Sequence, residues 1–281
     1  MNKASNPTSG SFRRNGTTYQ ITTEEIEQFK ERGYLILNDV ITEEELNTIQ
    51  PYFDYLIEGN MAEQMERDFC DMSQPYGTPI EDFKLVNAML PSKYCPELVG
   101  NIYYQVAQNI ANQLYEGKAA MDYEQFLAKK PQETDAEFAM HQDLGYWPKM
   151  ENTWTATFSL ALNDADVNNG CLQVVPGSNK EVELRSHSLK QFSTVNEDKK
   201  EGHTLVIDMK DSDDILYLPV KKGSLTVHDE RIIHGSGGNS TKEYRKTYVM
   251  AFRDIKTIAI ERSIGFNHSH NDEYYKKNAV V

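Results

Sequence analysis

The sequence has few cysteines, no long apolar run and no excess of positive charge, and each absence excludes a class of protein. Its three cysteines include no CxxC pair and no even-numbered framework, so we expect reduced thiols in a cytosol rather than disulfides. No stretch approaches about 18 uninterrupted apolar residues, which excludes a membrane-spanning helix. The net charge of -14 argues against nucleic acid or an anionic membrane as a partner. A cytoplasmic location is therefore predicted, and the oligomeric state stays open.

The composition suits one large domain that follows a polar tail. With 39% hydrophobic and 10% aromatic residues, the chain of 281 residues can bury a sizeable core. Residues 1–17 are polar and lack the apolar segment of a signal peptide, so we expect a disordered tail. Residues 18–281 are expected to form a single domain, with a helical part over 18–120 and a β-rich core over 121–260.

Capping patterns predict the first helices. Thr22-x-x-Glu25 is a capping box, and Gly33 stands where a left-handed residue would end that helix. A second box, Thr42-x-x-Glu45, opens a helix that we expect to run towards residue 58. A further helix is predicted from residue 96 to 117, because apolar residues recur there every four positions.

From residue 121 onward, short β-rich segments alternate with clusters of Gly, Pro, Asn and Asp. The segments are 122–130, 137–143, 154–162, 171–175, 204–208, 215–218, 224–228 and 244–253. This spacing predicts an α+β protein in which N-terminal helices support a double-stranded β-helix (jelly-roll) core. Residues 179–202 are interpreted as an insertion. Residues 60–82 are interpreted as an irregular excursion, which either forms a mobile lid or packs on the helical part.

His141 and Asp143 mark the candidate metal site. Alternate residues of a strand point to one face, so His141-Gln142-Asp143 presents an imidazole and a carboxylate together. A second histidine from a distant strand would complete the two-His-one-carboxylate set of non-haem Fe(II) oxygenases. The His-x-Asp pattern alone is weak, because His270-x-Asp272 repeats it in a polar tail. His141 differs in ending an apolar strand and opening an aromatic loop.

Two histidines compete for the remaining ligand position. His234 precedes a turn rich in Gly, Ser and Asn, which lets the chain reverse into a strand that carries Arg245. The guanidinium fork of Arg245 would pair with the far end of a dicarboxylate that chelates the metal. His228 lacks this arrangement, and we expect it to face the barrel or solvent. His234 is the favoured ligand, and His228 stays as the alternative.

These motifs resemble the phytanoyl-CoA dioxygenase family of Fe(II)- and 2-oxoglutarate-dependent oxygenases. The resemblance rests on the segments 141–147 and 169–178, on His234-Gly235-Ser236 and on Arg245, and it covers about residues 121–255. It implies iron binding by His141, Asp143 and His234, and 2-oxoglutarate binding by Arg245, Ser236 and Phe138. Two residues depart from the family pattern: Asn179 replaces a histidine, and Gly238 replaces a common proline.

Other residues near the metal loop allow more than one interpretation. By the resemblance, Trp147 and Tyr146 contact the substrate, although large aromatic residues beside a metal loop also serve core packing. Lys129 and Lys130 stand on the strand before the metal loop, and we expect them to form a solvated pair, with one lysine facing the pocket as the alternative.

The resemblance implies a dioxygenase that uses Fe(II), 2-oxoglutarate and O2 to hydroxylate an aliphatic C–H bond. Asp143 supports this, because related halogenases lack the carboxylate. A small polar metabolite, in a natural-product tailoring step, is the expected substrate. Desaturation, epimerisation, ring closure and C–N cleavage stay open as alternative outcomes. A non-catalytic jelly-roll binding protein would be expected to lack part of the ligand set, and a zinc hydrolase has no use for Arg245.

Overall fold

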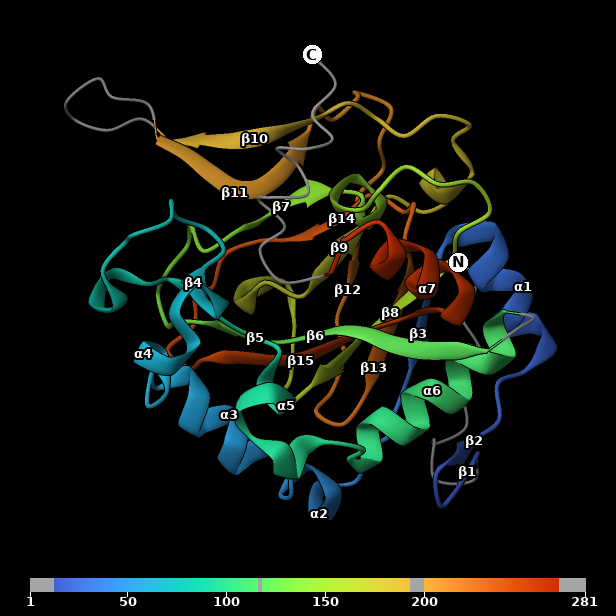
Figure 1. Ribbon diagram of the computed structural model, residues 1–281, viewed down its shortest axis with the longest axis horizontal. Coiled ribbons are helices and arrows are strands. Elements are labelled where there is room, and N and C mark those ends of the chain that lie inside the picture. Colours follow the sequence, from blue (N-terminus) through green and yellow to red (C-terminus); the bar gives the residue numbers. More distant parts are fainter. Residues whose placement is uncertain (1–12, 116–117, 193–199, 268–281) are drawn as a thin grey trace, which may run out of the picture.

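Two antiparallel sheets face each other in the computed structural model, which describes residues 13–115, 118–192 and 200–267 (Figure 1). The large sheet has the order β3 (Tyr34–Leu37), β13 (Leu225–Asp229), β8 (Thr155–Ala161), β15 (Arg245–Asp254), β6 (Ala119–Lys129), β5 (Leu85–Met89) and β4 (Phe69–Asp71). The small sheet has the order β12 (Leu216–Leu218), β9 (Leu172–Val174), β14 (His234–Ser236) and β7 (Phe138–His141). Two hairpins complete the strands: β1 (Arg14–Asn15) with β2 (Thr18–Tyr19), and β10 (His187–Phe192) with β11 (Lys200–Ile207).

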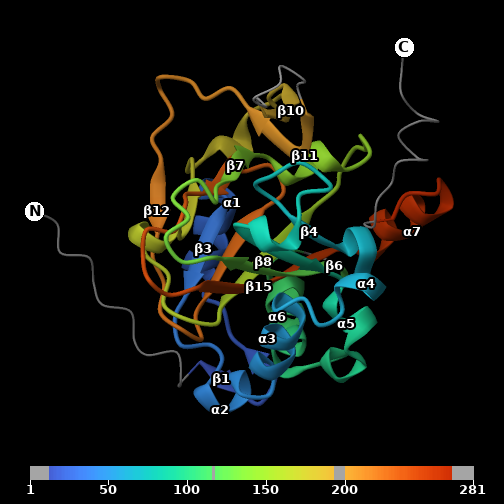
Figure 2. The same ribbon diagram turned by 90° about the vertical axis from the view of Figure 1, so that its left-hand side faces the viewer.

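Helices α3 (Gln50–Ile57), α5 (Pro91–Tyr94) and α6 (Ile102–Leu114) cover the face of the large sheet that points away from the small sheet (Figure 2). The other helices are α1 (Thr23–Arg32), α2 (Glu43–Leu46), α4 (Ala62–Met65) and α7 (Ile255–Ser263). Short 3-10 helices lie at Glu66–Asp68, Ile80–Asp82, Pro96–Leu98, Asp143–Tyr146, Val167–Asn169 and Ser178–Lys180. This arrangement confirms the predicted α+β class with a jelly-roll core. No described helix is long and apolar enough to cross a membrane.

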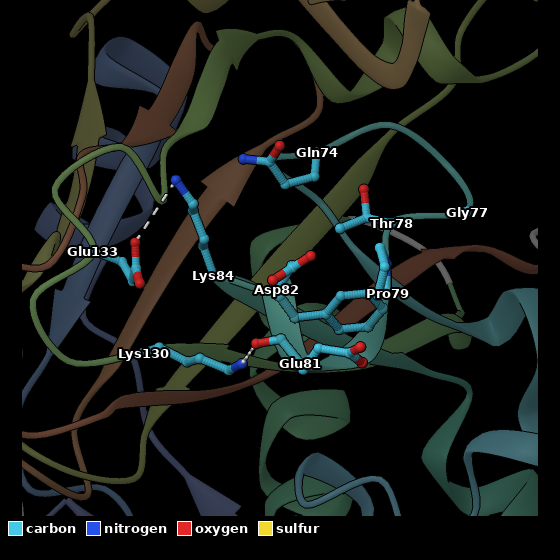
Figure 3. A pocket seen from close by; sticks show the side chains of 10 residues that line it. Gln74, Gly77, Thr78, Pro79, Glu81, Asp82, Lys84, Lys130 and Glu133 are labelled. Carbon is cyan, nitrogen blue, oxygen red and sulfur yellow. Dashed lines mark hydrogen bonds and ion pairs between the residues drawn. The ribbon is translucent and has the colours of Figure 1, made fainter. Parts of the chain in front are cut away.

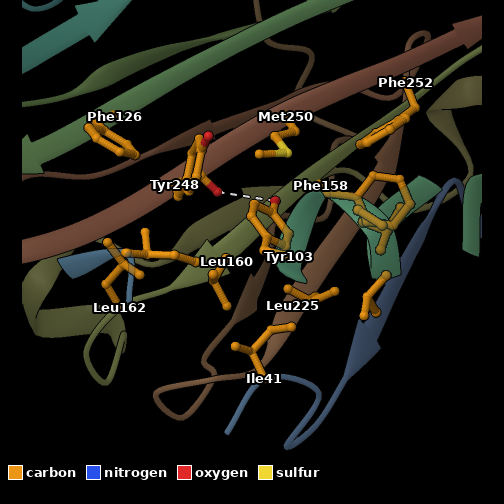
Figure 4. Close-up of a cluster of buried hydrophobic side chains, with 14 of the residues drawn as sticks. Ile41, Tyr103, Phe126, Phe158, Leu160, Leu162, Leu225, Tyr248, Met250 and Phe252 are labelled. Carbon is orange, nitrogen blue, oxygen red and sulfur yellow. Dashed lines mark hydrogen bonds between the residues drawn. The ribbon is translucent and has the colours of Figure 1, made fainter. Parts of the chain in front are cut away.

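The central strand β15 separates two environments by simple alternation. Tyr248 and Phe252 point to the helices and belong to the main hydrophobic core, where Tyr103 of α6 donates a hydrogen bond to the carbonyl of Tyr248 (Figure 4). Arg245 and Thr247 point the other way, towards the small sheet, where they line a cavity. Because successive side chains of a strand alternate between its faces, one strand both anchors the helices and supplies polar groups between the sheets.

The capping predictions are confirmed at both N-terminal helices. The Thr22 and Glu25 side chains bond reciprocally at the start of α1, and Gly33 ends the helix with a φ of 80°. The second capping box opens α2, but this helix ends at Leu46 and α3 begins at Gln50. Pro51, near the start of α3, explains the break, because it has no N–H to donate to the carbonyl of Asn47 and its ring would clash with that carbonyl in a continuous helix.

Several segments differ from the prediction. The helix expected from residue 96 begins at Ile102, where the Asn101 side chain accepts a hydrogen bond from the Tyr104 backbone. Segment 60–82 contains a strand of the large sheet, and its Met65 and Phe69 lie in the main core, which favours packing over a lid. The β10–β11 hairpin occupies part of the expected insertion and continues into the strand predicted over 204–208.

The chain ends were also predicted incompletely. The expected tail over 1–17 lies mostly outside the described residues, but Arg14 within it belongs to a hairpin and pairs with Glu45 at 2.6 Å. Helix α7 was not predicted, because its apolar residues do not share one face. Its buried residues are instead Thr257 and Glu261.

Gly238 provides a test of the turn that leads from β14 to β15. A Cβ atom on Gly238 would overlap the carbonyl oxygen of Thr134, which also accounts for the absence of the family's common proline. At the neighbouring Gly237, a Cβ atom would lie 3.1 Å from Nε2 of Gln173, a flexible side-chain end.

We expect Gly238→Ala to lower the free energy of unfolding by about 1–3 kcal/mol, because backbone atoms must move. Gly237→Ala should change it by less than about 0.5 kcal/mol. Urea denaturation measures both, and equal losses would contradict the proposed close approach.

Candidate metal centre

Two histidines and a carboxylate meet where the small sheet opens towards the large sheet. His141 ends β7 and His234 begins β14, and the two residues are direct partners across this antiparallel strand pair. Asp143 begins the 3-10 helix that follows β7. Its Oδ1 lies 3.3 Å from Nε2 of His141 and 3.4 Å from Nε2 of His234. The three potential ligand atoms lie within 4.8 Å of one another, so the cluster could hold a metal ion.

The backbone fixes the orientation of both imidazoles. Nδ1 of His141 lies 2.7 Å from the carbonyl of Ala139, and Nδ1 of His234 lies 3.0 Å from the carbonyl of Ile232. A carbonyl only accepts, so each Nδ1 carries the proton and each Nε2 presents a lone pair. Burial lowers the pKa of both histidines, which favours the neutral rings.

The donor set fits a divalent cation. Two Nε2 lone pairs and a carboxylate oxygen converge with no proton between them, an arrangement that a positive ion stabilises. Two histidines with one carboxylate are the ligand set of non-haem Fe(II) oxygenases.

His228 lies beside this cluster without belonging to it. Its ring centroid is 3.9 Å from that of His234, and its Nε2 is 3.2 Å from Oδ2 of Asp143. We expected His228 to face either the barrel or the solvent. It faces the barrel, because it is only 3% exposed. The same oxygen of Asp143 accepts a hydrogen bond from Thr157 at 2.9 Å. Nothing in the sequence around Thr157 indicated this contact.

A cavity of about 80 Å³ adjoins the cluster and gathers the other candidate residues. Phe138, Ser236 and Arg245 line it together with the three potential ligands. Nε of Arg245 is buried and has no hydrogen-bond partner among the described residues, and burial lowers the pKa of this guanidinium to about 10. A buried cation without a partner is costly, so the cavity suits an anionic ligand.

The expectation of a solvated lysine pair is wrong for Lys129. This residue is fully buried and faces Arg245 across the β6–β15 pair. Its Nζ donates to the carbonyls of Ala136 at 2.6 Å and Gly237 at 2.5 Å. Burial and the charge of Arg245 lower the pKa of Lys129 well below its ordinary value. The side chain therefore ties the loop before β7 to the turn after β14.

Tyr146 and Trp147 are not among the residues that line the cavity. The Tyr146 hydroxyl accepts a hydrogen bond from the backbone of Leu205 in β11 at 2.7 Å. The Trp147 ring centroid lies 4.2 Å from the guanidinium carbon of Arg253. These contacts tie the metal loop to the β10–β11 hairpin and to β15, and the substrate role of both residues stays a prediction.

A larger hollow of about 500 Å³ lies elsewhere, between residues 74–84 and 130–133 (Figure 3). It shares no lining residue with the metal cavity. Its cations already have partners: Lys84 pairs with Asp135 at 2.5 Å, and Lys130 donates to the carbonyl of Glu81. Size alone therefore does not identify the functional site, and it is the smaller cavity that is lined by the potential metal ligands and Arg245.

A jelly-roll core with this cluster between its sheets defines the class of non-haem Fe(II) oxygenases. The family model for phytanoyl-CoA dioxygenase (PhyH) matches residues 29–247, and the chain belongs to this family. Its members depend on Fe(II), 2-oxoglutarate and O2, so the prediction of family, enzyme class and cofactors is confirmed at family level.

Three known proteins illustrate the likeness. The peroxisomal phytanoyl-CoA dioxygenase of Mus musculus is 23% identical over 80% of this chain and 66% of its own length, just under two thirds. EvdO2 from Micromonospora carbonacea var. aurantiaca, solved with 2-oxoglutarate, has a TM-score of 0.67 at 24% identity, covering 84% of this chain and 92% of that one. SnoK, a non-haem α-ketoglutarate-dependent carbocyclase from nogalamycin biosynthesis, has a TM-score of 0.63 at 18% identity, covering 89% and 87%.

Glu230, which contacts the metal loop, makes the stability of the folded state depend on pH. Its carboxylate accepts hydrogen bonds from Thr153 and Thr155, both at 2.7 Å, and its carbonyl accepts one from Leu144 at 3.0 Å. Burial raises the pKa of Glu230 from 4.5 to about 7. The folded state therefore binds more protons than the unfolded state between these values, and this stabilisation is lost as the pH rises through about 7.

We expect Glu230→Gln to remove this dependence. The variant should gain stability relative to the wild type as the pH rises from about 5 to 8, by up to about 3 kcal/mol. Chemical denaturation at several pH values measures the difference. Parallel curves for the two proteins would contradict the raised pKa.

Proposed function

We propose that the chain is an Fe(II)- and 2-oxoglutarate-dependent dioxygenase that hydroxylates an aliphatic C–H bond of a small polar metabolite. The observation that carries the proposal is one cavity that holds both a convergent His/Asp/His cluster and a buried guanidinium without a partner on Nε. The cluster suits a metal ion, and the guanidinium suits a carboxylate. A dicarboxylate cosubstrate that binds the metal would satisfy both.

In this proposal, the iron ligands are His141, Asp143 and His234. Bound Fe(II) supplies O2 activation coupled to the decarboxylation of 2-oxoglutarate to succinate and CO2. Arg245 holds the distal carboxylate through its two-pronged donor set. Ser236 and Phe138 line the cavity beside it, and Phe138 stacks on His141 with ring centroids 5.0 Å apart.

The polarity of the cavity walls supports a small polar substrate. Gln125, Thr157, Ser159 and Thr247 contribute to the lining, and the chain carries a net charge of -14. This charge disfavours the phosphate groups of a CoA ester. A natural-product tailoring step agrees with the biosynthetic role in SnoK's name, which also keeps ring closure open as an alternative outcome. We expect a cytoplasmic location, and assign Trp147 and Tyr146 to the outer substrate wall.

The metal cluster predicts a specific spectrum. Anaerobic addition of Fe(II) and 2-oxoglutarate should give a weak visible charge-transfer band. His234→Ala should abolish this band, because the two remaining ligands, His141 and Asp143, are too few to hold the ion. Lys84→Ala, in the larger hollow, is the matched control and should retain the band. Loss of the band in Lys84→Ala together with its retention in His234→Ala would show that the metal does not bind at the His/Asp/His cluster.

Arg245 predicts how 2-oxoglutarate affinity depends on the guanidinium. Removing one partner of a buried charge pair costs about 3–5 kcal/mol, so Arg245→Ala should raise the dissociation constant of 2-oxoglutarate about a hundredfold or more. Fe(II) affinity should be largely retained. Arg245→Lys keeps a positive charge but loses the two-pronged guanidinium, so its dissociation constant for 2-oxoglutarate should lie between those of the wild type and Arg245→Ala. Calorimetric titration measures these constants, and an unchanged constant in Arg245→Ala would refute the role.

A further inference from the structure

We propose that Thr157 and His228 are positioning residues that reserve one oxygen of Asp143 for the metal and withhold the other. The inference rests on the proposed function of the cluster as an iron site. It concerns the two carboxylate oxygens, whose surroundings differ.

Oδ1 of Asp143 faces the two ligand histidines, whereas Oδ2 faces two hydrogen-bond donors. Thr157 Oγ1 lies 2.9 Å from Oδ2, and His228 Nε2 lies 3.2 Å from it. Both contacts are with Oδ2, whereas Oδ1 lies 3.3 and 3.4 Å from the Nε2 atoms of His141 and His234. The carboxylate therefore has one side directed at the metal position and one side held by the protein.

The large sheet builds this support from a single cross-strand pair. His228 of β13 and Thr157 of β8 are direct partners in the antiparallel ladder, so their side chains leave the same face. They are 3% and 5% exposed. The large sheet thus holds a carboxylate that belongs to the loop after β7 of the small sheet, and links the two halves of the jelly roll at the metal position.

The chemistry of His228 explains why it is a support rather than a ligand. A carboxylate only accepts, so the Nε2 of His228 carries the proton in this contact and has no lone pair for a metal. Its Nδ1 is buried without a hydrogen-bond partner among the described residues. A rotation that brought His228 to the metal would leave Oδ2 with only the Thr157 hydroxyl.

The consequence concerns the number of open positions on the metal. If both oxygens of Asp143 bound, Thr157 and His228 would lose their acceptor in a buried site, which is unfavourable. Ligation through one oxygen leaves three positions open, enough for a bidentate cosubstrate and O2. Partners of this kind around a metal ligand commonly change affinity or activity about 10–100-fold when they are removed.

The test compares variants that delete each donor with variants that keep one. Thr157→Val removes the hydroxyl at nearly constant volume, and Thr157→Ser restores it. His228→Leu removes the N–H, and His228→Gln restores one. Thr226→Val is the control, since Thr226 is a buried threonine two residues before His228 on β13 and does not line the cavity.

Two measurements separate positioning from folding. Co(II), added without 2-oxoglutarate, reports metal affinity and coordination number through its visible absorption. Anaerobic titration of the Fe(II)-loaded protein with 2-oxoglutarate reports cosubstrate affinity. In Thr157→Val and His228→Leu we expect the Co(II) band to shift from its wild-type position, because the second oxygen of Asp143 replaces a solvent ligand. We also expect an approximately tenfold higher dissociation constant for 2-oxoglutarate. The donor-keeping variants and Thr226→Val should stay within about threefold of the wild type.

Two results would overturn the inference. One is wild-type behaviour of the deletion variants in both measurements. The other is an equal loss in Thr157→Val and Thr157→Ser, because that indicates a packing role. The comparison of Thr157→Val with Thr157→Ser tests the inference even if a His228 variant does not fold. Failure of the proposed function is distinguishable, because then the wild type itself would bind neither Co(II) nor 2-oxoglutarate.

Discussion

Alternation along the strands of the large sheet is the constraint on which the molecule depends. Each central strand must present an apolar face to the helices and a polar face to the space between the sheets. In β15 this places Phe252 in the core, while Thr247 points into the cavity. The same rule pairs Thr157 with His228 on the polar face. A shift of one residue in register would exchange the two faces and remove both the core and the site.

Buried cations show how this interior treats charge. The guanidinium of Arg253 pairs with the carboxylates of Asp122 and Glu261, and Glu261 comes from α7. Lys129 directs its Nζ to backbone carbonyls. Arg245 differs from Arg253 because no carboxylate pairs with it among the described residues, and its buried Nε also has no hydrogen-bond partner there. Since an uncompensated buried charge is costly, this difference supports the binding role proposed for Arg245.

Local sequence signals predicted those elements whose determinants lie within a few residues. Reciprocal bonds between Thr22 and Glu25 need only four adjacent positions, and they form as expected. Helix α7 gave no such signal, because its buried residue Glu261 is held by Arg253 of the preceding strand β15 rather than by an apolar stripe. Segment 60–82 was ambiguous for another reason: Met65 and Phe69 are buried by residues far away in the chain.

At the candidate site, the sequence alone determined the set of residues and the chemistry that they suit. The pattern His141-x-Asp143, with His234 before a turn and Arg245 beyond it, predicted one cluster, and the structure brings these residues to one cavity. Only the tertiary structure shows that His141, Asp143 and His234 form a cluster that could hold a metal, with His228 beside it. It also decided that Lys129 is buried rather than solvated. The physical reason is that periodicity determines which residues share a face of a strand. What that face meets depends on the strands and loops that fold against it.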